Sequence, residues 1–236
     1  MEYLAGGNLE DYLKQRRQLD INTIRFLAAE IICGLQFLHS RGFIHRDIKP
    51  ANIILDSAGH AKIADFGLAI QTTNGTAQGC TGTPGYIAPE MSQNVEYNEA
   101  VDYYSLGVIL FQMATGMDGY YVRHISNLEC MQTLEPELKD IIIKLLCPDP
   151  AERTEYVQQI KDHPFFGPVN WEVLRAGRIY PPFTPTPPTG ISRSLTYEEL
   201  FDTEGDETVA VIPEERVGEF LFLCPEWQNT LSLHRH

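Results

Sequence analysis

The sequence is short of cysteine, of positive charge and of long hydrophobic runs, and each shortage argues against a class of protein. Its five cysteines are scattered, odd in number and without CxxC spacing, which argues against a disulfide framework or a zinc site and favours a reducing, cytoplasmic location. The 18 Lys and Arg are outnumbered by 32 Asp and Glu, whereas a protein that binds nucleic-acid polymers is usually basic. The longest apolar run, Leu106–Phe111, is too short to cross a bilayer, so we expect no transmembrane segment.

Helical spacing dominates the first two thirds of the chain, which is long enough at 236 residues for one large domain or two small ones. Apolar residues from Ile24 to Leu38 recur at helical spacing and predict a helix that Asp20 caps and Gly42 ends. A second helix, expected at about 99–115, is apolar on most sides and should therefore be buried. Further helices are expected at about 135–146 and 154–161.

Strand, loop and tail signals complete this outline. Residues 53–55 and 61–63 flank the turn signal Ser57-Ala58-Gly59-His60, which predicts a short hairpin. Residues 70–87 are rich in Thr, Gly and Gln and are expected to form a long loop, a kind that is usually functional or disordered. Residues 181–236 carry ten acidic and three basic residues, about half of the net charge of −14, and begin with a proline-rich stretch. We expect an extended tail there.

Two motifs carry the chemistry. Residues 45–52 read His-Arg-Asp-Ile-Lys-Pro-Ala-Asn, and Asp65-Phe66-Gly67 begins thirteen residues after Asn52. Asp47 can accept a hydroxyl proton, Lys49 can neutralise a transferring phosphate, and Asn52 and Asp65 can bind magnesium. Alone, Asp47 could be a surface residue and Asp-Phe-Gly a common turn. In this order, with strand-like residues between them, the two motifs favour phosphoryl transfer.

These motifs resemble the C-terminal lobe of a eukaryotic Ser/Thr protein kinase. Further segments extend the resemblance to nearly the whole chain and narrow it to the AGC group, with protein kinase C the most similar. In the D-x-W-S-x-G segment, Tyr104 replaces the tryptophan. The segments that carry the resemblance are Gly82–Glu90, Asp102–Gly107, Leu145–Arg153, His163–Phe166, Asn170–Trp171 and Pro181–Phe183.

The resemblance implies a fold class, a domain division and cofactors. It implies a mainly α protein-kinase-like C-lobe, a helical bundle with a small catalytic-loop β-hairpin, and an extended C-terminal tail. Residues 1–166 would be a partial kinase domain comprising hinge and C-lobe, and residues 167–236 the AGC-type tail. The cofactors would be ATP and Mg²⁺, and the substrate a protein Ser or Thr, to which Lys49 points.

The resemblance also assigns roles residue by residue. Asp47 and Lys49 would be catalytic, and Asn52 and Asp65 would hold the metal. Glu90 and Arg153 would form a buried ion pair, whereas His39 and His60 are expected to be ordinary surface or satisfied histidines. The nucleotide would contact Glu2, Leu4, Lys49, Asn52, Ile54 and Asp65. The structural set is His45, Arg46, Phe66, Gly67, Thr83, Glu90, Asp102 and Arg153.

The largest departure from the family concerns the N-terminal lobe. The Gly-rich phosphate loop, the strand Lys and the helix Glu of a complete kinase are absent from these 236 residues. We therefore expect a fragment or an incomplete gene model, with negligible activity alone. The rival hypothesis is a catalytically dead binding module that competes for substrates or docking partners. The tail motif Phe220-Leu221-Phe222 would normally dock on the missing lobe.

Two smaller departures concern regulation and substrate choice. Gly79 stands where the family has a phosphorylated Thr, so Thr76, Thr81 or neither would serve, and the partner of Arg46 is open. Asn8 and Ala51 replace acidic residues that recognise basic substrates in related kinases. Glu10, Asp11 and Asp118 could compensate in part, and we expect a weaker preference for Arg than protein kinase C shows.

Overall fold

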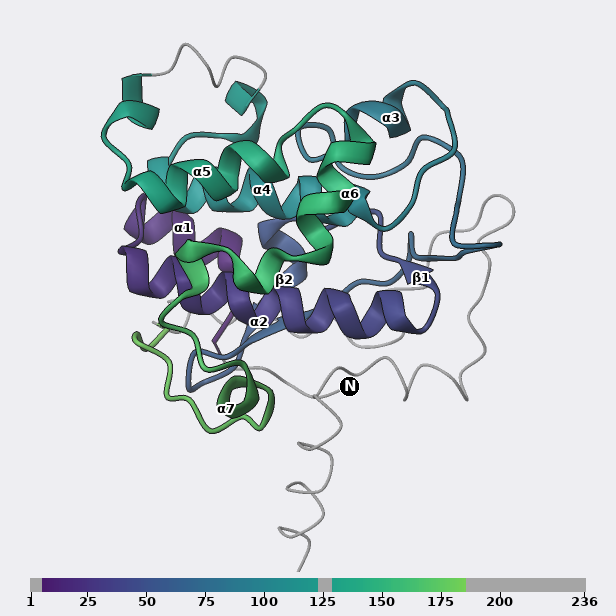
Figure 1. Cartoon of the computed structure of the whole chain (residues 1–236). Coiled ribbons are helices and arrows are strands. Elements are labelled where there is room, and N and C mark those ends of the chain that lie inside the picture. The colour runs from purple at the N-terminus through teal and green to yellow at the C-terminus, as the bar shows by residue number, and fades with distance from the viewer. Residues whose placement is uncertain (1–5, 123–128, 186–236) are drawn as a thin grey trace, which may run out of the picture.

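The computed structural model describes residues 6–122 and 129–185, and Figure 1 shows them as a mainly helical body. The expectations for Glu2, Leu4, Phe220 and Phe222 lie outside the described residues. The longer helices are α1 (Leu9–Arg16), α2 (Ile21–Ser40), α4 (Ala100–Thr115), α5 (Pro136–Leu145) and α6 (Pro150–Gln158). The shorter elements are α3 (Pro89–Ser92), α7 (Trp171–Arg175), β1 (Phe43–Ile44), β2 (Ile53–Leu55), β3 (Ala61–Ile63), β4 (Ile70–Gln71), η1 (Pro50–Asn52), η3 (Glu129–Gln132), η4 (Ile160–Asp162) and η5 (Pro164–Phe166).

Helices α2 and α4 form the centre of the core, as the sequence predicted. Asp20 caps α2 by accepting hydrogen bonds from the backbone N–H groups of Asn22 and Thr23, which satisfies two donors that the helix leaves without a partner. Helix α4 packs against α2, α5 and α6, and 13 of its 16 residues are buried. At Gly107 an added Cβ would lie 2.9 Å from Leu145 Cβ, so only glycine allows α4 and α5 to approach this closely.

Helix α2 is long and apolar enough, by length and composition alone, to cross a membrane. The expectation of no such segment considered only the apolar run of α4 and overlooked this helix. Half of the 20 residues of α2 are buried, and the helix packs against α4 and β3. A core helix passes the same test of length and composition, and packing within the fold accounts for the apolar face of α2.

Two small antiparallel sheets lie beside these helices. The predicted hairpin is confirmed, with Ile53 opposite Ile63 and Leu55 opposite Ala61. The segment 70–87 was expected to be loop throughout, but it begins with β4, which pairs with β1. Each of these strands has only two residues, and so short a strand carries no periodicity that a sequence could reveal.

Helix boundaries were predicted less well than helix positions. Helix α6 begins at Pro150 and not near 154, because Asp149 caps it by accepting a bond from the N–H of Ala151 at 2.8 Å. Helices α1 and α7 were not predicted, although Asn8 and Asn170 cap them in the same way. The sequence shows the Asn residues that cap α1 and α7, but the apolar patterns that follow them are too short to predict a helix.

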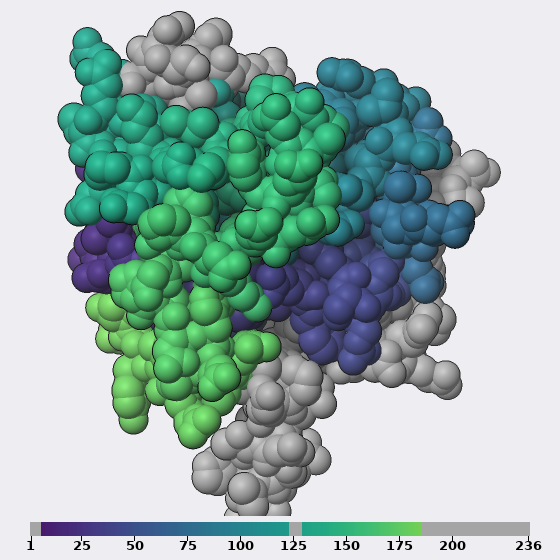
Figure 2. Space-filling model, viewed as in Figure 1, coloured from purple at the N-terminus to yellow at the C-terminus, as the bar shows by residue number. Residues whose placement is uncertain are grey.

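The chain after α6 crosses the face of α2, as Figures 1 and 2 show in green over blue and purple. Its last described residues reach α1, where the rings of Phe183 and Tyr12 lie 5.1 Å apart. They also reach the turn between β2 and β3, where the carbonyl oxygen of Phe183 lies next to Gly59. This segment therefore ties α1, α2 and the hairpin together.

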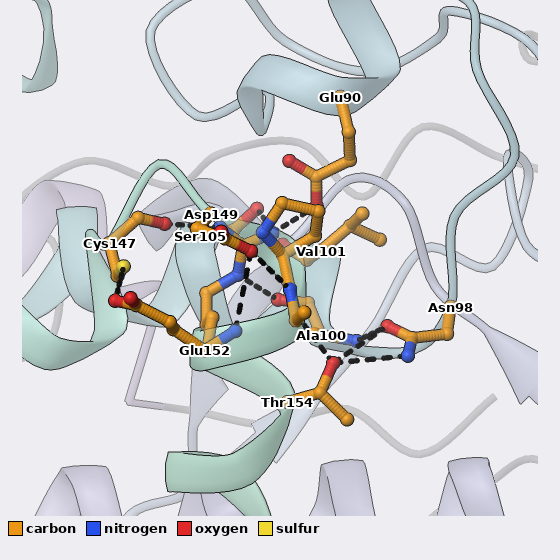
Figure 3. Close-up of polar contacts among 12 residues, drawn as sticks. Glu90, Asn98, Ala100, Val101, Ser105, Cys147, Asp149, Glu152 and Thr154 are labelled. Carbon is orange, nitrogen blue, oxygen red and sulfur yellow. Dashed lines mark hydrogen bonds and ion pairs between the residues drawn. The ribbon is translucent and has the colours of Figure 1, made fainter.

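A buried ion pair joins α3 to α6. Arg153, fully buried, bonds through Nη2 to Glu90 Oε1 and donates through Nε to the carbonyl oxygen of Ala100 at 3.0 Å. Burial lowers the pKa of the guanidinium, and the Glu90 carboxylate opposes that effect. Figure 3 shows Glu90 entering this cluster from the side opposite Cys147 and Glu152. The ring of Tyr104, which replaces the family's Trp, lies 5.5 Å from the guanidinium carbon.

We predict that Glu90→Gln lowers the free energy of unfolding by about 3 kcal/mol, because it leaves the buried Arg153 charge uncompensated. Urea unfolding monitored by tryptophan fluorescence measures the loss. The control is Glu155→Gln, an exposed position on α6, which should change stability by less than about 0.5 kcal/mol. Equal losses in the two variants would contradict this role for the pair.

Candidate active site

The Asp47 carboxylate lies at the centre of a compact polar cluster. Its Oδ1 accepts hydrogen bonds from the backbone N–H and the hydroxyl of Thr83, at 2.9 and 2.6 Å. Its Oδ2 lies 2.7 Å from Lys49 Nζ and 3.1 Å from Asn52 Nδ2. Burial raises the pKa of Asp47, but the bonds from Lys49 and Thr83 outweigh burial and hold it below its ordinary value. The group is therefore an anion at neutral pH.

The backbone around Asp47 is held in place by Asp102 of α4. Arg46 has φ +68°, a left-handed conformation that costs free energy for a residue with a Cβ. The Asp102 carboxylate accepts the backbone N–H groups of His45 at 2.9 Å and Arg46 at 2.8 Å. It also accepts from His39 Nε2 at 2.7 Å. Burial raises the pKa of Asp102, and these donors lower it further than burial raises it.

His45 packs beneath the site as a neutral imidazole. Its Nδ1 accepts the backbone N–H of Asp47 at 3.3 Å, and its Nε2 lies 3.0 Å from the carbonyl oxygen of Ala64. Nε2 is therefore the protonated nitrogen. Burial lowers the pKa of His45, and its ring meets that of Phe66 edge to face at 5.1 Å. This ring contact packs the loop that carries Asp47 against Asp65-Phe66-Gly67.

The β2–β3 hairpin brings Asn52 and Asp65 to one end of the site. The N–H of Ala64 donates to the carbonyl oxygen of Asn52 at 2.9 Å, which places Asp65 directly beyond the paired strands. The Asn52 amide nitrogen donates to Asp47, so its oxygen is the atom that remains for a cation. Asp65, at φ +60°, is exposed. An amide oxygen and a carboxylate are ligands suited to magnesium. In the part of the chain that the structure describes, no group of three or more His, Cys, Asp or Glu side chains forms a metal cluster.

Ile54, the remaining described residue of the expected nucleotide site, lies half-buried in the middle of β2. It forms a bridge with Asn8, and Leu55 exchanges backbone hydrogen bonds with Gly6 and Gly7. The chain just before α1 therefore runs antiparallel to β2. The structure thus places residues 6–8 against the strand that carries Ile54.

His39 and His60 are both satisfied histidines, one of the two states expected for them. His39 Nε2 lies 2.7 Å from Asp102 Oδ2, 63 positions away in the sequence, a partner that the sequence did not reveal. His60 Nδ1 lies 2.7 Å from Glu30 Oε1, which satisfies it as expected but away from the open surface. Burial raises the pKa of Glu30, and the bond to Glu30 raises that of His60. Local sequence patterns do not predict hydrogen-bonded pairs of residues that are so far apart in the chain.

A hollow of about 370 Å³ opens beside the site, next to Pro50. Glu10 and Asp118, two of the acidic residues that could compensate in part for the weakened recognition of basic substrates, lie on its wall. Glu10 is already paired with Lys14 at 2.7 Å. Two neutral lining residues are bonded to each other, because the Tyr86 hydroxyl donates to Gln112 Oε1 at 2.6 Å. The lining residues are Glu10, Leu13, Lys14, Arg17, Pro50, Tyr86, Gln112, Gly116, Met117 and Asp118.

The family model of the protein kinase domain matches residues 1–166. The chain belongs to the protein kinase family. This kinase-family chain is 41% identical to human protein kinase C delta type over 196 residues, covering 78% of the chain and 29% of that relative. It is 36% identical to a probable cAMP-dependent protein kinase catalytic subunit of Encephalitozoon cuniculi, covering 92% and 70%. It is 32% identical to the serine/threonine-protein kinase YPK1 of Saccharomyces cerevisiae, covering 96% and 36%.

These relatives are Ser/Thr kinases of the AGC type, and the protein kinases, the family to which the chain belongs, are as a class transferases that use ATP and Mg²⁺. The chain spans less than a third of the length of protein kinase C delta type. The kinase-family motifs coincide in space with the polar cluster around Asp47.

We predict that Asp102→Asn lowers the free energy of unfolding by about 3 kcal/mol at pH 7, because buried donors lose their anionic acceptor. The pKa of Asp102 is depressed in the folded protein. Its stabilisation is therefore complete well above the ordinary carboxyl pKa and is lost as pH falls through the folded value. The difference in the free energy of unfolding between wild type and Asp102→Asn should stay constant from pH 7 to about 5 and should become smaller below about pH 5. Urea unfolding from pH 7 to 3, with exposed Asp162→Asn as control, measures it. A difference that stays constant down to pH 3 would contradict the depressed pKa.

Proposed function

We propose that this chain is the hinge and C-terminal lobe of an AGC-type Ser/Thr protein kinase, with residues 1–166 as partial kinase domain and residues 167–236 as tail. The reaction is transfer of the γ-phosphoryl group of Mg-ATP to a protein Ser or Thr. The observation that carries the proposal is the Asp47 carboxylate, an anion held by Lys49, Thr83 and Asn52 at the end of a hairpin that also positions Asp65.

In this proposal Asp47 orients the substrate hydroxyl and accepts its proton. Both carboxylate oxygens are fixed by hydrogen bonds, so Asp47 needs little rearrangement to present a lone pair. Its depressed pKa makes it a weak base, which suits a group that takes the proton only when the hydroxyl has become acidic in the transition state. Lys49 neutralises phosphate charge, and Asn52 and Asp65 hold magnesium. Mg-ATP, when bound, supplies the phosphoryl group and offsets its charge.

The 236 residues supply only part of what phosphoryl transfer requires. A Gly-rich loop, a strand Lys and a helix Glu normally orient the phosphates, and the sequence contains no such set. Removing electrostatic positioning of this kind typically costs several kcal/mol of barrier. We propose that the chain alone has negligible activity, and that the N-terminal lobe is the docking surface for the tail.

We also propose a cytoplasmic location and protein substrates, with no nucleic-acid polymer as partner. The cysteines of the described residues carry free thiols, as is usual in a reducing compartment. The excess of acidic residues disfavours binding to the negatively charged phosphate backbone of a nucleic acid.

The decisive measurement is phosphoryl transfer with and without an N-terminal lobe. We predict no transfer by the 236-residue chain, and turnover once it is joined to the N-terminal lobe of a relative such as protein kinase C delta type. In the joined protein, Asp47→Asn should lower kcat by about 10²–10⁴-fold, while Asp162→Asn should leave it unchanged.

Robust metal-dependent phosphorylation by the chain alone would refute the proposed inactivity. Full activity of the Asp47→Asn variant would refute the catalytic role of Asp47. No turnover in the joined protein, together with binding of a kinase substrate by the chain, would favour the competing binding module.

Substrate preference follows from the charges around the hollow. The Asn8 side chain caps α1 by accepting the N–H of Asp11 at 2.8 Å, and Ala51 offers no charge. Glu10 is paired with Lys14, and Asp118 accepts the N–H of Tyr120 at 2.9 Å. We propose that no carboxylate here is free to bind a substrate Arg strongly, so the preference for Arg is weak.

We predict that a peptide array on the joined protein shows little enrichment of Arg upstream of the phosphoacceptor. Ala51→Glu should raise the preference for Arg over Ala about tenfold, since a partly buried carboxylate can pair with guanidinium. The control is Ala51→Gln, which has the same size without the charge. The proposal would be contradicted if Arg upstream of the phosphoacceptor dominated the peptide array on the unaltered joined protein.

A further inference from the structure

Arg46 of the catalytic loop has two neutral partners. Its Nε donates to the carbonyl oxygen of Leu68 at 2.7 Å, and its Nη1 donates to the hydroxyl of Tyr97 at 3.3 Å. The backbone of Arg46 is fixed by Asp102, so its guanidinium starts from a defined position. Both acceptors are oxygen atoms without formal charge.

Tyr97 extends this contact into the long loop. Its hydroxyl donates to the carbonyl oxygen of Gly79 at 3.0 Å. Its backbone exchanges two hydrogen bonds with Ala77, each 2.9 Å long. The side chain is buried at 3% exposure among Ile44, Ala88 and neighbouring apolar residues. Tyr97 therefore binds the loop at Ala77 and at Gly79 and connects it to Arg46.

The loop itself is shaped for this contact. Gly79 has φ +107° and nothing within 4 Å of an added Cβ, so glycine is required there by conformation and not by crowding. Gly82 has φ +113°, and an added Cβ would lie 2.5 Å from the carbonyl oxygen of Arg46. The loop backbone therefore lies directly on Arg46. The Thr76 hydroxyl has a partner of its own, because it donates to the carbonyl oxygen of Thr73 at 3.2 Å.

We propose that Tyr97 is the positioning residue of the loop 77–83, and that its hydroxyl, by bridging Arg46 to Gly79, orders this loop without phosphorylation. The segment ends at Thr83, whose N–H and hydroxyl both bind Asp47. Anchoring the loop at Ala77 and Gly79 thereby holds Thr83 on the carboxylate. The regulatory meaning of this anchor rests on the proposed kinase function, but the order of the loop can be measured without it.

The test is hydrogen exchange on the 236-residue chain made in bacteria and shown by mass spectrometry to carry no phosphate. The amides of Ala77 and Thr83 report on the loop, because each donates to a partner outside it. We expect both to be protected in the unphosphorylated protein. Tyr97→Phe, which removes only the hydroxyl, should speed their exchange about tenfold.

Hydrogen exchange in α4 distinguishes a positioning role of the Tyr97 hydroxyl from a general loss of packing. The Tyr97 ring packs in the same apolar cluster as Met91 and Val101, so a general loss of packing would speed exchange in α3 and α4 too. In Tyr97→Phe the ring remains, and α4 should exchange as in wild type. The control, Tyr156→Phe, removes a hydroxyl from a side chain at 40% exposure on α6 and should change nothing.

Arg46→Lys provides a second variant, since lysine cannot reach Leu68 and Tyr97 with two nitrogen atoms at once. It should loosen the loop as Tyr97→Phe does. Unchanged loop exchange in both variants would overturn the proposal. So would a wild-type loop that gains protection only after phosphorylation of Thr76 or Thr81. None of these measurements needs ATP or a substrate, so failure of the proposed kinase function would leave their outcome unaffected.

Discussion

The buried carboxylate of Asp102 is the interaction on which the rest of the site depends. It lies in the first turn of α4, without exposure to solvent. Such a charge is costly unless its oxygens are fully hydrogen-bonded. Three donors from two places meet it: the His39 ring at the end of α2, and the consecutive backbone N–H groups of His45 and Arg46 in the loop after β1. One side chain therefore joins the two main helices to the loop that carries Asp47 and compensates the left-handed backbone of Arg46.

The left-handed backbone conformation of Arg46 orients both the Asp47 carboxylate and the Arg46 side chain. It turns the following residue, Asp47, so that its carboxylate meets Lys49, Asn52 and Thr83. It also directs the Arg46 side chain the other way, toward Leu68 and Tyr97. A change in the loop around Gly79 can thus reach Asp47 along two routes, through Thr83 and through Arg46. Both routes are short chains of hydrogen bonds between elements fixed in the core.

The sequence predicted well those features that depend on local patterns. The helices around Ile24–Leu38 and 99–115 and the hairpin of β2 and β3 follow from periodicity, caps and a turn signal. The grouping of Asp47, Lys49 and Asn52 follows from their spacing within one loop and short turn. What the sequence did not reveal are pairs between distant segments, such as His39 with Asp102 and Tyr97 with Gly79. Only the packing of α2 against α4, and of the loop against α4's beginning, brings those atoms together.

The two ends of the site differ in their exposure to solvent, and this difference explains how its chemistry divides. Asp47 and Asn52 are buried, at 5% and 6% exposure, so their hydrogen bonds act in a medium of low polarity, where they are strong. Asp65 is exposed, and Leu68 beyond it is 38% exposed. Water screens the charge of an exposed carboxylate and weakens its hold on a cation. The Asp47 end of the site is therefore preorganised by this fold alone, whereas the Asp65 carboxylate would hold a cation strongly only if a bound group or a covering segment excluded water from it.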